Sequence, residues 1–181
     1  MSGKTSRTVI RRSKSVDAGS AVPRVGIGYD VHAFTIGRKL ILGGVHIPYR
    51  LGLLGHSDAD VLLHALCDAL LGAAALGDIG KHFPDTSAKY KNVSSLRLLR
   101  NVRRLLTKHN FRIVNLDTTI ILQQPKVLRY SPQMIYNIAT ALALKPGQIS
   151  IKATTNEGIG FIGRGEGCAA LAIATILPSK T

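Results

Sequence analysis

The chain has 181 residues, with 24 Lys and Arg against ten Asp and Glu, and a formal net charge of +14. This length and a hydrophobic share of 45% predict one packed domain and exclude a disordered basic protein. Two cysteines, Cys67 and Cys168, are too few for a disulfide framework and favour a reducing compartment. No apolar run is long enough to cross a bilayer, so we expect a soluble protein without a membrane partner.

The positive charge could attract nucleic acid, an anionic membrane surface or a phosphorylated small substrate. Residues 1–24 hold six basic residues and one acid, and we predict a disordered basic extension over 1–22 before a single domain at 23–181. The helix face with Arg97, Arg100, Arg103 and Arg104 is interpreted as solvated surface. Aromatic residues are sparse, so nucleic acid is not the expected partner, although a basic nucleic-acid-binding protein stays an alternative.

In chain order, the first predicted elements are a strand over 24–29, a loop over 30–32 and a hairpin. The hairpin joins 40–42 to 45–47 through Gly43 and Gly44. A long apolar helix follows, with Ser57 as its N-cap, Asp60 completing a capping box, and Gly77 after its last residue, Leu76.

The second half of the chain alternates helices with strands. A helix from Ser94 places apolar residues on one side and arginines on the other. A strand over 116–122, a helix from Ser131 to Leu144 and a strand over 149–155 follow. The segment 168–176 is predicted as a strand, although a buried helix is an alternative. This order predicts an α/β (α+β) sandwich with helices on one face of a mixed sheet.

A metal site is predicted at Asp30, His32 and His64. Residues two apart in an extended segment project to the same side, so Asp30 and His32 can approach one ion. Two His and one Asp leave a position open for substrate, as in catalytic zinc sites. His64 could otherwise be a core histidine. Asp60 and Asp68 lie one helical turn on either side of His64, where a carboxylate could orient its ring, and Asp60 could instead cap the helix.

Four segments carry further candidate binding groups. His56 and Ser57, at the expected start of the helix, could bind a phosphate. The loops 77–80 and 83–86 could orient a small polyol, or be surface turns. Thr154, Thr155 and Glu157 offer hydroxyls to a phosphate and a carboxylate to Mg²⁺. The G-x-G-x-x-G at 158–163 is rejected as a dinucleotide motif, because no acidic residue follows about 20 positions later.

These motifs occur together and in order: Asp30-Val31-His32, residues 55–64, 77–80 with 83–86, Gln124-Pro125-Lys126, 152–157 and 163–167. Over about residues 24–177 the chain thereby resembles the 2-C-methyl-D-erythritol 2,4-cyclodiphosphate synthase family. The resemblance implies a ferredoxin-like sandwich assembled as a homotrimer, with active sites between subunits. It implies a phosphorus–oxygen lyase of the non-mevalonate isoprenoid (terpenoid) pathway, which cyclises 4-diphosphocytidyl-2-C-methyl-D-erythritol 2-phosphate and releases CMP. A zinc phosphohydrolase is the remaining enzymatic alternative.

The resemblance also implies roles for individual residues. Zn²⁺ would be held by Asp30, His32 and His64, a second ion, Mg²⁺ or Mn²⁺, by Glu157, and the transition state would be stabilised by His56 and Thr155. The remaining substrate-binding positions implied by the resemblance are Val31, Ser57, Asp78, Ile79, Gly80, Phe83, Pro84, Asp85, Thr86, Ser87, Leu122, Gln123, Gln124, Pro125, Lys126, Val127, Leu128, Thr154, Asn156, Phe161 and Arg164. Phe161 and Arg164 also match positions near the trimer axis, where some members hold an isoprenoid diphosphate.

The chain departs from the family pattern at two positions and in two segments. In the cytidine loop, residues 122–128, the contacts are expected from the backbone more than from the side chains. Ile27 and Tyr29 stand where the family often has His and Phe, close to the expected trimer axis. Residues 1–22 lie outside the resemblance. Their short length favours a bacterial, cytoplasmic protein, and their Arg and Ser content fits a remnant of an organellar transit peptide, as for a plastid-type organelle.

Overall fold

The computed structural model describes residues 22–90 and 92–179, so the extension predicted over 1–22 lies, except for Val22, outside the described residues. The strands are β1 (Arg24–Thr35), β2 (Leu40–Leu42), β3 (Val45–Ile47), β4 (Gly52–Leu53), β5 (Phe111–Ile121), β6 (Ile149–Thr154) and β7 (Gly167–Pro178). The α-helices are α1 (Val61–Ala73), α2 (Ile79–His82), α3 (Ser95–Lys108), α4 (Ser131–Leu142) and α5 (Gly160–Gly163). Short 3-10 turns lie at η1 (Ala88–Tyr90), η2 (Leu128–Tyr130) and η3 (Pro146–Gln148). None of the helices in this described part is both long and apolar enough to cross a membrane.

A mixed five-stranded sheet in the order β4-β1-β7-β5-β6 forms one layer, and the hairpin β2-β3 forms a separate two-stranded sheet. The chain's last strand, β7, pairs antiparallel with both β1 and β5 along most of its length. The strand assignment of 168–176 is therefore confirmed. β5 and β6 form the parallel pair, joined by the crossover helix α4.

The predicted layers are confirmed, but the connectivity differs from the ferredoxin-like order. A ferredoxin-like chain runs β-α-β-β-α-β. Here the long strands and their helices run β-α-β-α-β-β, because β5 and β6 each follow a helix and β7 follows β6 with only α5 between them. The parallel pair at β5 and β6 is the consequence of that order.

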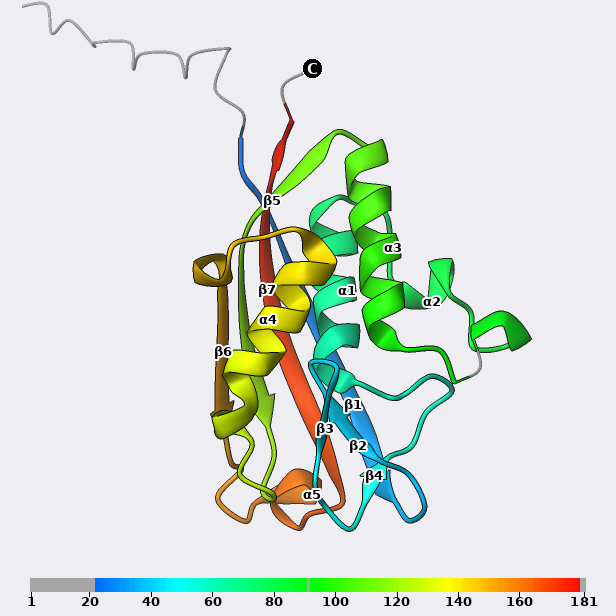
Figure 1. Cartoon of the computed structure of the whole chain (residues 1–181), viewed down its shortest axis with the longest axis vertical. Helices are drawn as coiled ribbons and strands as arrows, with labels where there is room; N and C mark the ends of the chain where they lie inside the picture. Colours follow the sequence, from blue (N-terminus) through cyan, green and yellow to red (C-terminus); the bar gives the residue numbers. More distant parts are fainter. Residues whose placement is uncertain (1–21, 91, 180–181) are drawn as a thin grey trace, which may run out of the picture.

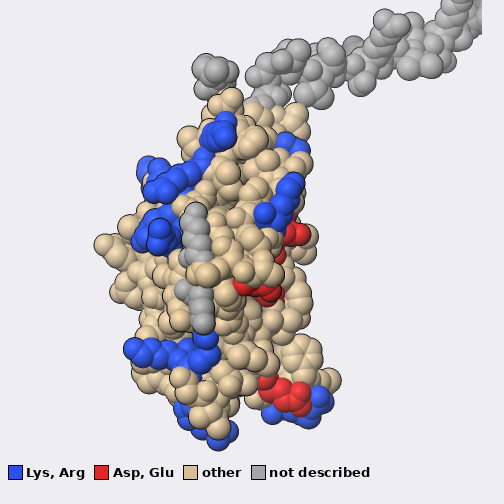
Figure 2. All heavy atoms as spheres, turned by 90° about the vertical axis from the view of Figure 1, so that its right-hand side faces the viewer, with Lys and Arg blue, Asp and Glu red and all other residues tan. Residues whose placement is uncertain are grey.

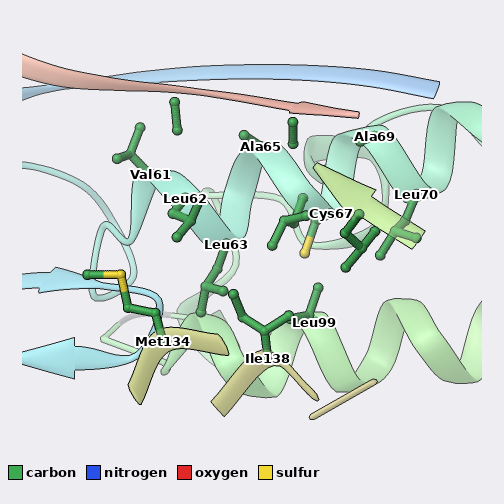
Figure 3. Packing of buried hydrophobic residues seen from close by; sticks show 14 of the residues in the cluster. Val61, Leu62, Leu63, Ala65, Cys67, Ala69, Leu70, Leu99, Met134 and Ile138 are labelled. Carbon is green, nitrogen blue, oxygen red and sulfur yellow. The ribbon is translucent and has the colours of Figure 1, made fainter. Parts of the chain in front are cut away.

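The helices α1, α3 and α4 cover one face of the sheet (Figure 1). Helix α1 lies in the middle of the core, with the strands on one side and Leu99, Met134 and Ile138 of the other two helices on the opposite side (Figure 3). Ten of its 13 residues are buried, because it contacts neighbours around most of its circumference. Its position is thus set by both layers.

Two glycines let α1 approach β1 down to backbone contact. A Cβ atom added to Gly28 would lie 2.0 Å from the carbonyl oxygen of Ala65, and one added to Gly26 would lie 2.1 Å from that of Ala69. Real Cβ atoms essentially never come within 3.0 Å of such an atom. The G-x-G spacing in β1 therefore brings the His64 turn of α1 close to the strand residues that follow Gly28.

The opposite face of the sheet carries apolar side chains that remain exposed in the single chain. β1 alternates buried glycines with exposed larger residues, so that Ile27 is 69% exposed and Tyr29 is 51% exposed. Leu171 and Ile173 of the neighbouring β7 extend this surface. These exposed side chains of β1 and β7 are here termed the apolar sheet face.

Four boundary predictions are wrong. The strand predicted over 116–122 begins five residues earlier, at Phe111, because β7 pairs with β5 from that residue onward. Asp30–His32 lies within β1 and not in a loop, because β7 pairs with β1 as far as Ala33. Helix α1 begins at Val61 with Asp60 as its N-cap, so the capping box predicted at Ser57 does not form, and the helix ends at Ala73. Helix α4 includes Ser131, has Tyr130 as its N-cap, and ends at Leu142 because Ala143 adopts a left-handed conformation.

Candidate metal centre and substrate cavities

The three predicted metal ligands converge at the end of α1 that faces β1. Asp30 Oδ2 lies 3.0 Å from both His32 Nε2 and His64 Nδ1, and these two nitrogens lie 3.2 Å apart. Asp30 and His32 project to the same side of β1, and His64 reaches them from the first turns of α1. Within the described residues, this is the cluster of His, Cys, Asp and Glu side chains that could hold a metal ion.

The spacing of these atoms fits a small tetrahedral cation. A tetrahedron with ligand bonds of about 2.0–2.1 Å has edges of about 3.3–3.4 Å. The three observed edges, 3.0, 3.0 and 3.2 Å, are within a few tenths of an ångström of that value. All three side chains are partly exposed, so a fourth position would face the cavity described below. Geometry and donor set therefore both suit a metal with one open position.

The electrostatics of the cluster also favour a cation. Burial acts to raise the pKa of the Asp30 carboxyl, but hydrogen bonds from His32 and His64 outweigh it and hold the pKa far below its usual range. Burial acts to lower the pKa of His32, but the hydrogen bond and the charge of Asp30 raise it overall. Asp30 is thus an anion at neutral pH, and its field stabilises positive charge at this point.

Beyond the cluster, the other ring nitrogen of His64 contacts two serines. Its Nε2 lies 2.9 Å from Ser95 Oγ and 3.0 Å from Ser57 Oγ. Ser95 Oγ donates to Asp58 Oδ1 at 2.5 Å, and its single hydroxyl proton is thereby used. Ser95 therefore accepts from His64 Nε2, and a ring protonated at Nε2 can bind a cation through Nδ1, which lies 3.0 Å from Asp30 Oδ2. The short chain Asp58–Ser95–His64 sets the tautomer that a metal ligand needs.

The carboxylates one turn from His64 have other partners. Asp60 is fully buried and accepts from the backbone N–H groups of Gly43, Gly44 and Leu63, so it caps α1 and ties the β2-β3 turn to it. Asp68 accepts from the N–H of Ile79 at 2.7 Å and so positions α2. The capping alternative for Asp60 is confirmed, and the role of orienting the ring belongs to Ser95, a residue that sequence reasoning missed.

The metal cluster opens into a cavity of about 550 Å³, a volume typical of small-molecule sites. His56 stands in its wall and its Nε2 lies 3.2 Å from the carbonyl oxygen of Ser87, which ties the predicted loop 83–87 to the metal side. Phe83 packs edge-to-face on Tyr90, with ring centres 5.5 Å apart. The lining brings together many of the predicted residues: His32, His56, Ser57, His64, Ile79, Gly80, Phe83, Pro84, Asp85 and Thr86. Asp78 stands beside it as the N-cap of α2.

The other half of the predicted site lies in a separate cavity of about 250 Å³. It lies between the segment after β5 and the end of β6, and is lined by Leu122, Pro125, Lys126, Val127, Leu128, Ala153, Thr154, Thr155 and Glu157. Thr155 Oγ1 donates to the Glu157 carboxylate. Gln123 receives the N–H of Gly158 at 3.5 Å, and the Gln124-Pro125 bond is cis. No residue lines both cavities, so the single chain does not unite the two groups of predicted residues.

Phe161 and Arg164 lie apart from both cavity linings, on and after the four-residue helix α5. Phe161 is 43% exposed, and Arg164 Nε donates to Glu166 at 2.6 Å. Asn156 holds the same loop, since its side chain donates to the carbonyl of Ile159. The short helix and the turn after it agree with rejecting the G-x-G-x-x-G segment as a dinucleotide motif, which needs a full helix.

Comparison with known proteins agrees with this geometry. Residues 23–177 match the model of the YgbB family. The chain belongs to this family. A relative from Clostridium novyi (strain NT), named 2-C-methyl-D-erythritol 2,4-cyclodiphosphate synthase, is 60% identical over 153 residues, which are 84% of this chain and 98% of that protein.

Two solved structures of family proteins resemble the fold closely. The IspF of Plasmodium falciparum, solved as a CDP complex, has a TM-score of 0.77 and 35% identity over 87% of this chain and 97% of that chain. The bifunctional IspDF of Campylobacter jejuni has a TM-score of 0.85 and 44% identity over 88% of this chain. The present chain spans 43% of that bifunctional protein.

Proposed function

We propose that this chain is a 2-C-methyl-D-erythritol 2,4-cyclodiphosphate synthase of the non-mevalonate isoprenoid pathway. It cyclises 4-diphosphocytidyl-2-C-methyl-D-erythritol 2-phosphate: a 2-phosphate oxygen bonds to the β-phosphorus, the bond from that phosphorus to the bridging oxygen breaks, and CMP leaves. The observation that carries the proposal is the Asp30, His32 and His64 cluster opening into a cavity of about 550 Å³, in a chain 60% identical to a protein of that name.

Asp30, His32 and His64 would hold Zn²⁺, and Glu157 would contribute to binding Mg²⁺ or Mn²⁺ with the substrate phosphates. Two borderline or hard cations supply charge neutralisation and alignment for phosphoryl transfer, which needs little covalent help from the protein. The N and O donor set of the first site suits zinc, and a lone carboxylate beside phosphate-binding hydroxyls suits Mg²⁺ or Mn²⁺.

The protein's own side chains orient the substrate on either side of the reacting phosphates. His56, held by the Ser87 carbonyl, and the loop 83–87 would bind the methylerythritol phosphate in the larger cavity, together with Asp78, Ile79 and Gly80. Thr155 would turn its hydroxyl from Glu157 to a phosphate oxygen when that carboxylate binds a cation. His56 and Thr155 would thus donate hydrogen bonds to the phosphoryl oxygens on which negative charge develops.

The smaller cavity would hold the cytidine diphosphate part. Lys126 places a positive charge in its lining, and Thr154 and Thr155 offer hydroxyls. The solved Plasmodium falciparum protein of the same fold is described as a CDP complex. Backbone groups of 122–128, positioned by the end of β5, would recognise the base.

A homotrimer with composite active sites would unite the two cavities. On one chain they share no lining residue, so a complete site needs the larger cavity of one copy beside the smaller cavity of another. The apolar sheet face supports assembly, since exposed Val25, Ile27 and Tyr29 would be covered by neighbouring copies. Near that face, Phe161 and Arg164 would line an axial cavity able to take an isoprenoid diphosphate.

Buried, unpaired Cys67 and Cys168 support a reducing compartment such as the cytoplasm.

The direct test is incubation of the metal-replete protein with the diphosphocytidyl substrate and Mg²⁺, followed by product identification. CMP and the cyclic diphosphate should appear in equal amounts. Linear monophosphates with free phosphate would identify a zinc phosphohydrolase instead, and an absence of CMP would contradict the proposal. A His64→Ala chain should lose bound zinc and turnover together, and retained zinc would refute that ligand assignment.

A further inference from the structure

A third cavity lies on the outer side of α3, outside the metal centre. Its volume is about 460 Å³, within the range of small-molecule sites. We call it the arginine groove, and its lining residues are Tyr90, Val93, Arg97, Leu98, Arg100, Asn101 and Arg104. Tyr90 and Leu98 also line the substrate cavity, so the two hollows share a wall.

The three arginines follow helical spacing and lie on one side of α3. Arg97, Arg100 and Arg104 are three and four residues apart, so their side chains project over the same groove. The sequence of α3 contains no Asp or Glu, and the ion pairs found over residues 22–90 and 92–179 include none of these arginines. Arg104 donates to the amide oxygen of Asn101 at 3.1 Å, a neutral partner that leaves its charge uncompensated.

The positive charge extends beyond the groove. Arg104 also lines a neighbouring hollow of about 330 Å³ together with Lys108. Figure 2 faces the side of the molecule that carries α3, and Lys and Arg side chains gather on its upper left part. Several cations in one concave surface raise the local concentration of anions, because low-dielectric walls focus their field.

The geometry points to the arginine groove as a binding site for a small organic anion with two or more phosphoryl groups. Guanidinium groups bind phosphate oxygens in pairs of parallel hydrogen bonds, and three of them here can serve separate phosphoryl groups. Val93 and Leu98 also line the hollow and offer an apolar surface to the ligand's carbon skeleton. A walled hollow of this volume matches a bisphosphate better than a polynucleotide, whose binding would need stacking aromatics along an open track.

Calorimetric titration of the full-length, metal-replete protein with fructose 1,6-bisphosphate tests the site. We expect one bisphosphate per chain, and at least tenfold weaker binding of fructose 6-phosphate. The double variant Arg100→Ala/Arg104→Ala should weaken bisphosphate binding at least tenfold. Alanine is the strongest helix former, so α3 should stay folded, which circular dichroism and the Tm can check.

Two matched variants separate the groove from general charge and from the metal centre. Arg103 lies on the same helix and is exposed, but it does not line the groove, so Arg103→Ala should change the Kd less than twofold. His64→Ala should leave bisphosphate binding intact, because His64 belongs to the metal cluster. Equal weakening by Arg103→Ala, or no binding at millimolar bisphosphate, would overturn the proposal. So would tighter binding of a single-stranded oligonucleotide that Arg100→Ala/Arg104→Ala abolishes, since that occupant is a polynucleotide.

Discussion

The hydroxyl of Ser95 lies 2.9 Å from Nε2 of His64, on the side of the ring that faces away from Asp30 and His32. Asp58 fixes that serine twice, through its hydroxyl at 2.5 Å and its backbone N–H at 3.0 Å. A buried serine at the start of α3 thereby orients a predicted metal ligand on α1. The geometry of the metal site therefore depends on how α3 packs against α1.

Ser95→Ala should weaken zinc binding about 10–100-fold, the usual cost of removing a group that orients a ligating histidine. The ring would lose the acceptor that Asp58 holds in place, would keep only Ser57 Oγ at 3.0 Å from Nε2, and could rotate or change tautomer. Competition with a chromogenic chelator measures the zinc Kd. Ser94→Ala is the matched control, because Ser94 is exposed and its side chain makes no capping hydrogen bond. Equal zinc affinity in Ser95→Ala and Ser94→Ala would contradict this role.

Gly28→Ala should destabilise the fold and separate the metal ligands. The new Cβ would lie 2.0 Å from the Ala65 carbonyl oxygen, so α1 must move away from β1 and carry His64 with it. We expect a loss of roughly 3 kcal/mol or more in the free energy of unfolding, as for severe overpacking of a core. Urea unfolding and zinc content measure both effects. At Gly147, an added Cβ meets no heavy atom within 4 Å, so Gly147→Ala should change neither the free energy of unfolding nor the zinc content.

Asp60 should make the stability of the fold depend on pH. Burial and the charge of Asp58 raise its pKa to about 7 in the folded chain, against hydrogen bonds from Gly43, Gly44 and Leu63 that act to lower it. Since this pKa exceeds the ordinary 3.8, the folded state holds the proton more tightly. The stabilisation is therefore fully present below about pH 4 and is lost as the pH rises through about 7.

The measurement is urea unfolding of the natural chain and of Asp60→Asn at pH 4 and pH 8. From pH 4 to pH 8, the free energy of unfolding of the natural chain should fall by on the order of 1–4 kcal/mol relative to that of the variant. Asparagine does not titrate, so the difference isolates Asp60 from other groups. A difference that stays level or grows with pH would mean that the three N–H donors keep Asp60 ionised.

The local patterns of the sequence were sufficient for most elements of the fold. The hairpin around Gly43 and Gly44 and the start of α3 after Ser94 are confirmed, because each depends on residues close in the chain. The extent of β1 was not predictable in this way. Its residues 30–33 are strand because β7, more than 130 residues later, supplies the pairing partners.

The same difference between contacts close in the chain and contacts far apart in the chain applies to the candidate site. Asp30, His32 and His64 could be predicted from residue type and spacing, and the structure brings them together. Ser95 could not, because its contact with His64 spans 31 residues and depends on how α3 packs on α1. A serine directly after the N-cap of a helix has no signal that separates it from an ordinary first-turn residue.

The proposed trimer, with each active site between two copies, predicts complementation, because the two cavities of one chain share no lining residue. His64→Ala impairs the larger cavity, and Lys126→Ala/Thr155→Ala impairs the smaller one, so each homo-oligomer should be nearly inactive. In mixed forms of the proposed trimer, some sites would pair an intact larger cavity with an intact smaller one from the neighbour. With random assembly of equal amounts, about one quarter of the sites are intact. CMP release by the co-expressed variants should therefore reach about one quarter of the natural rate, whereas sites contained within one chain would give no more than the sum of the two inactive variants.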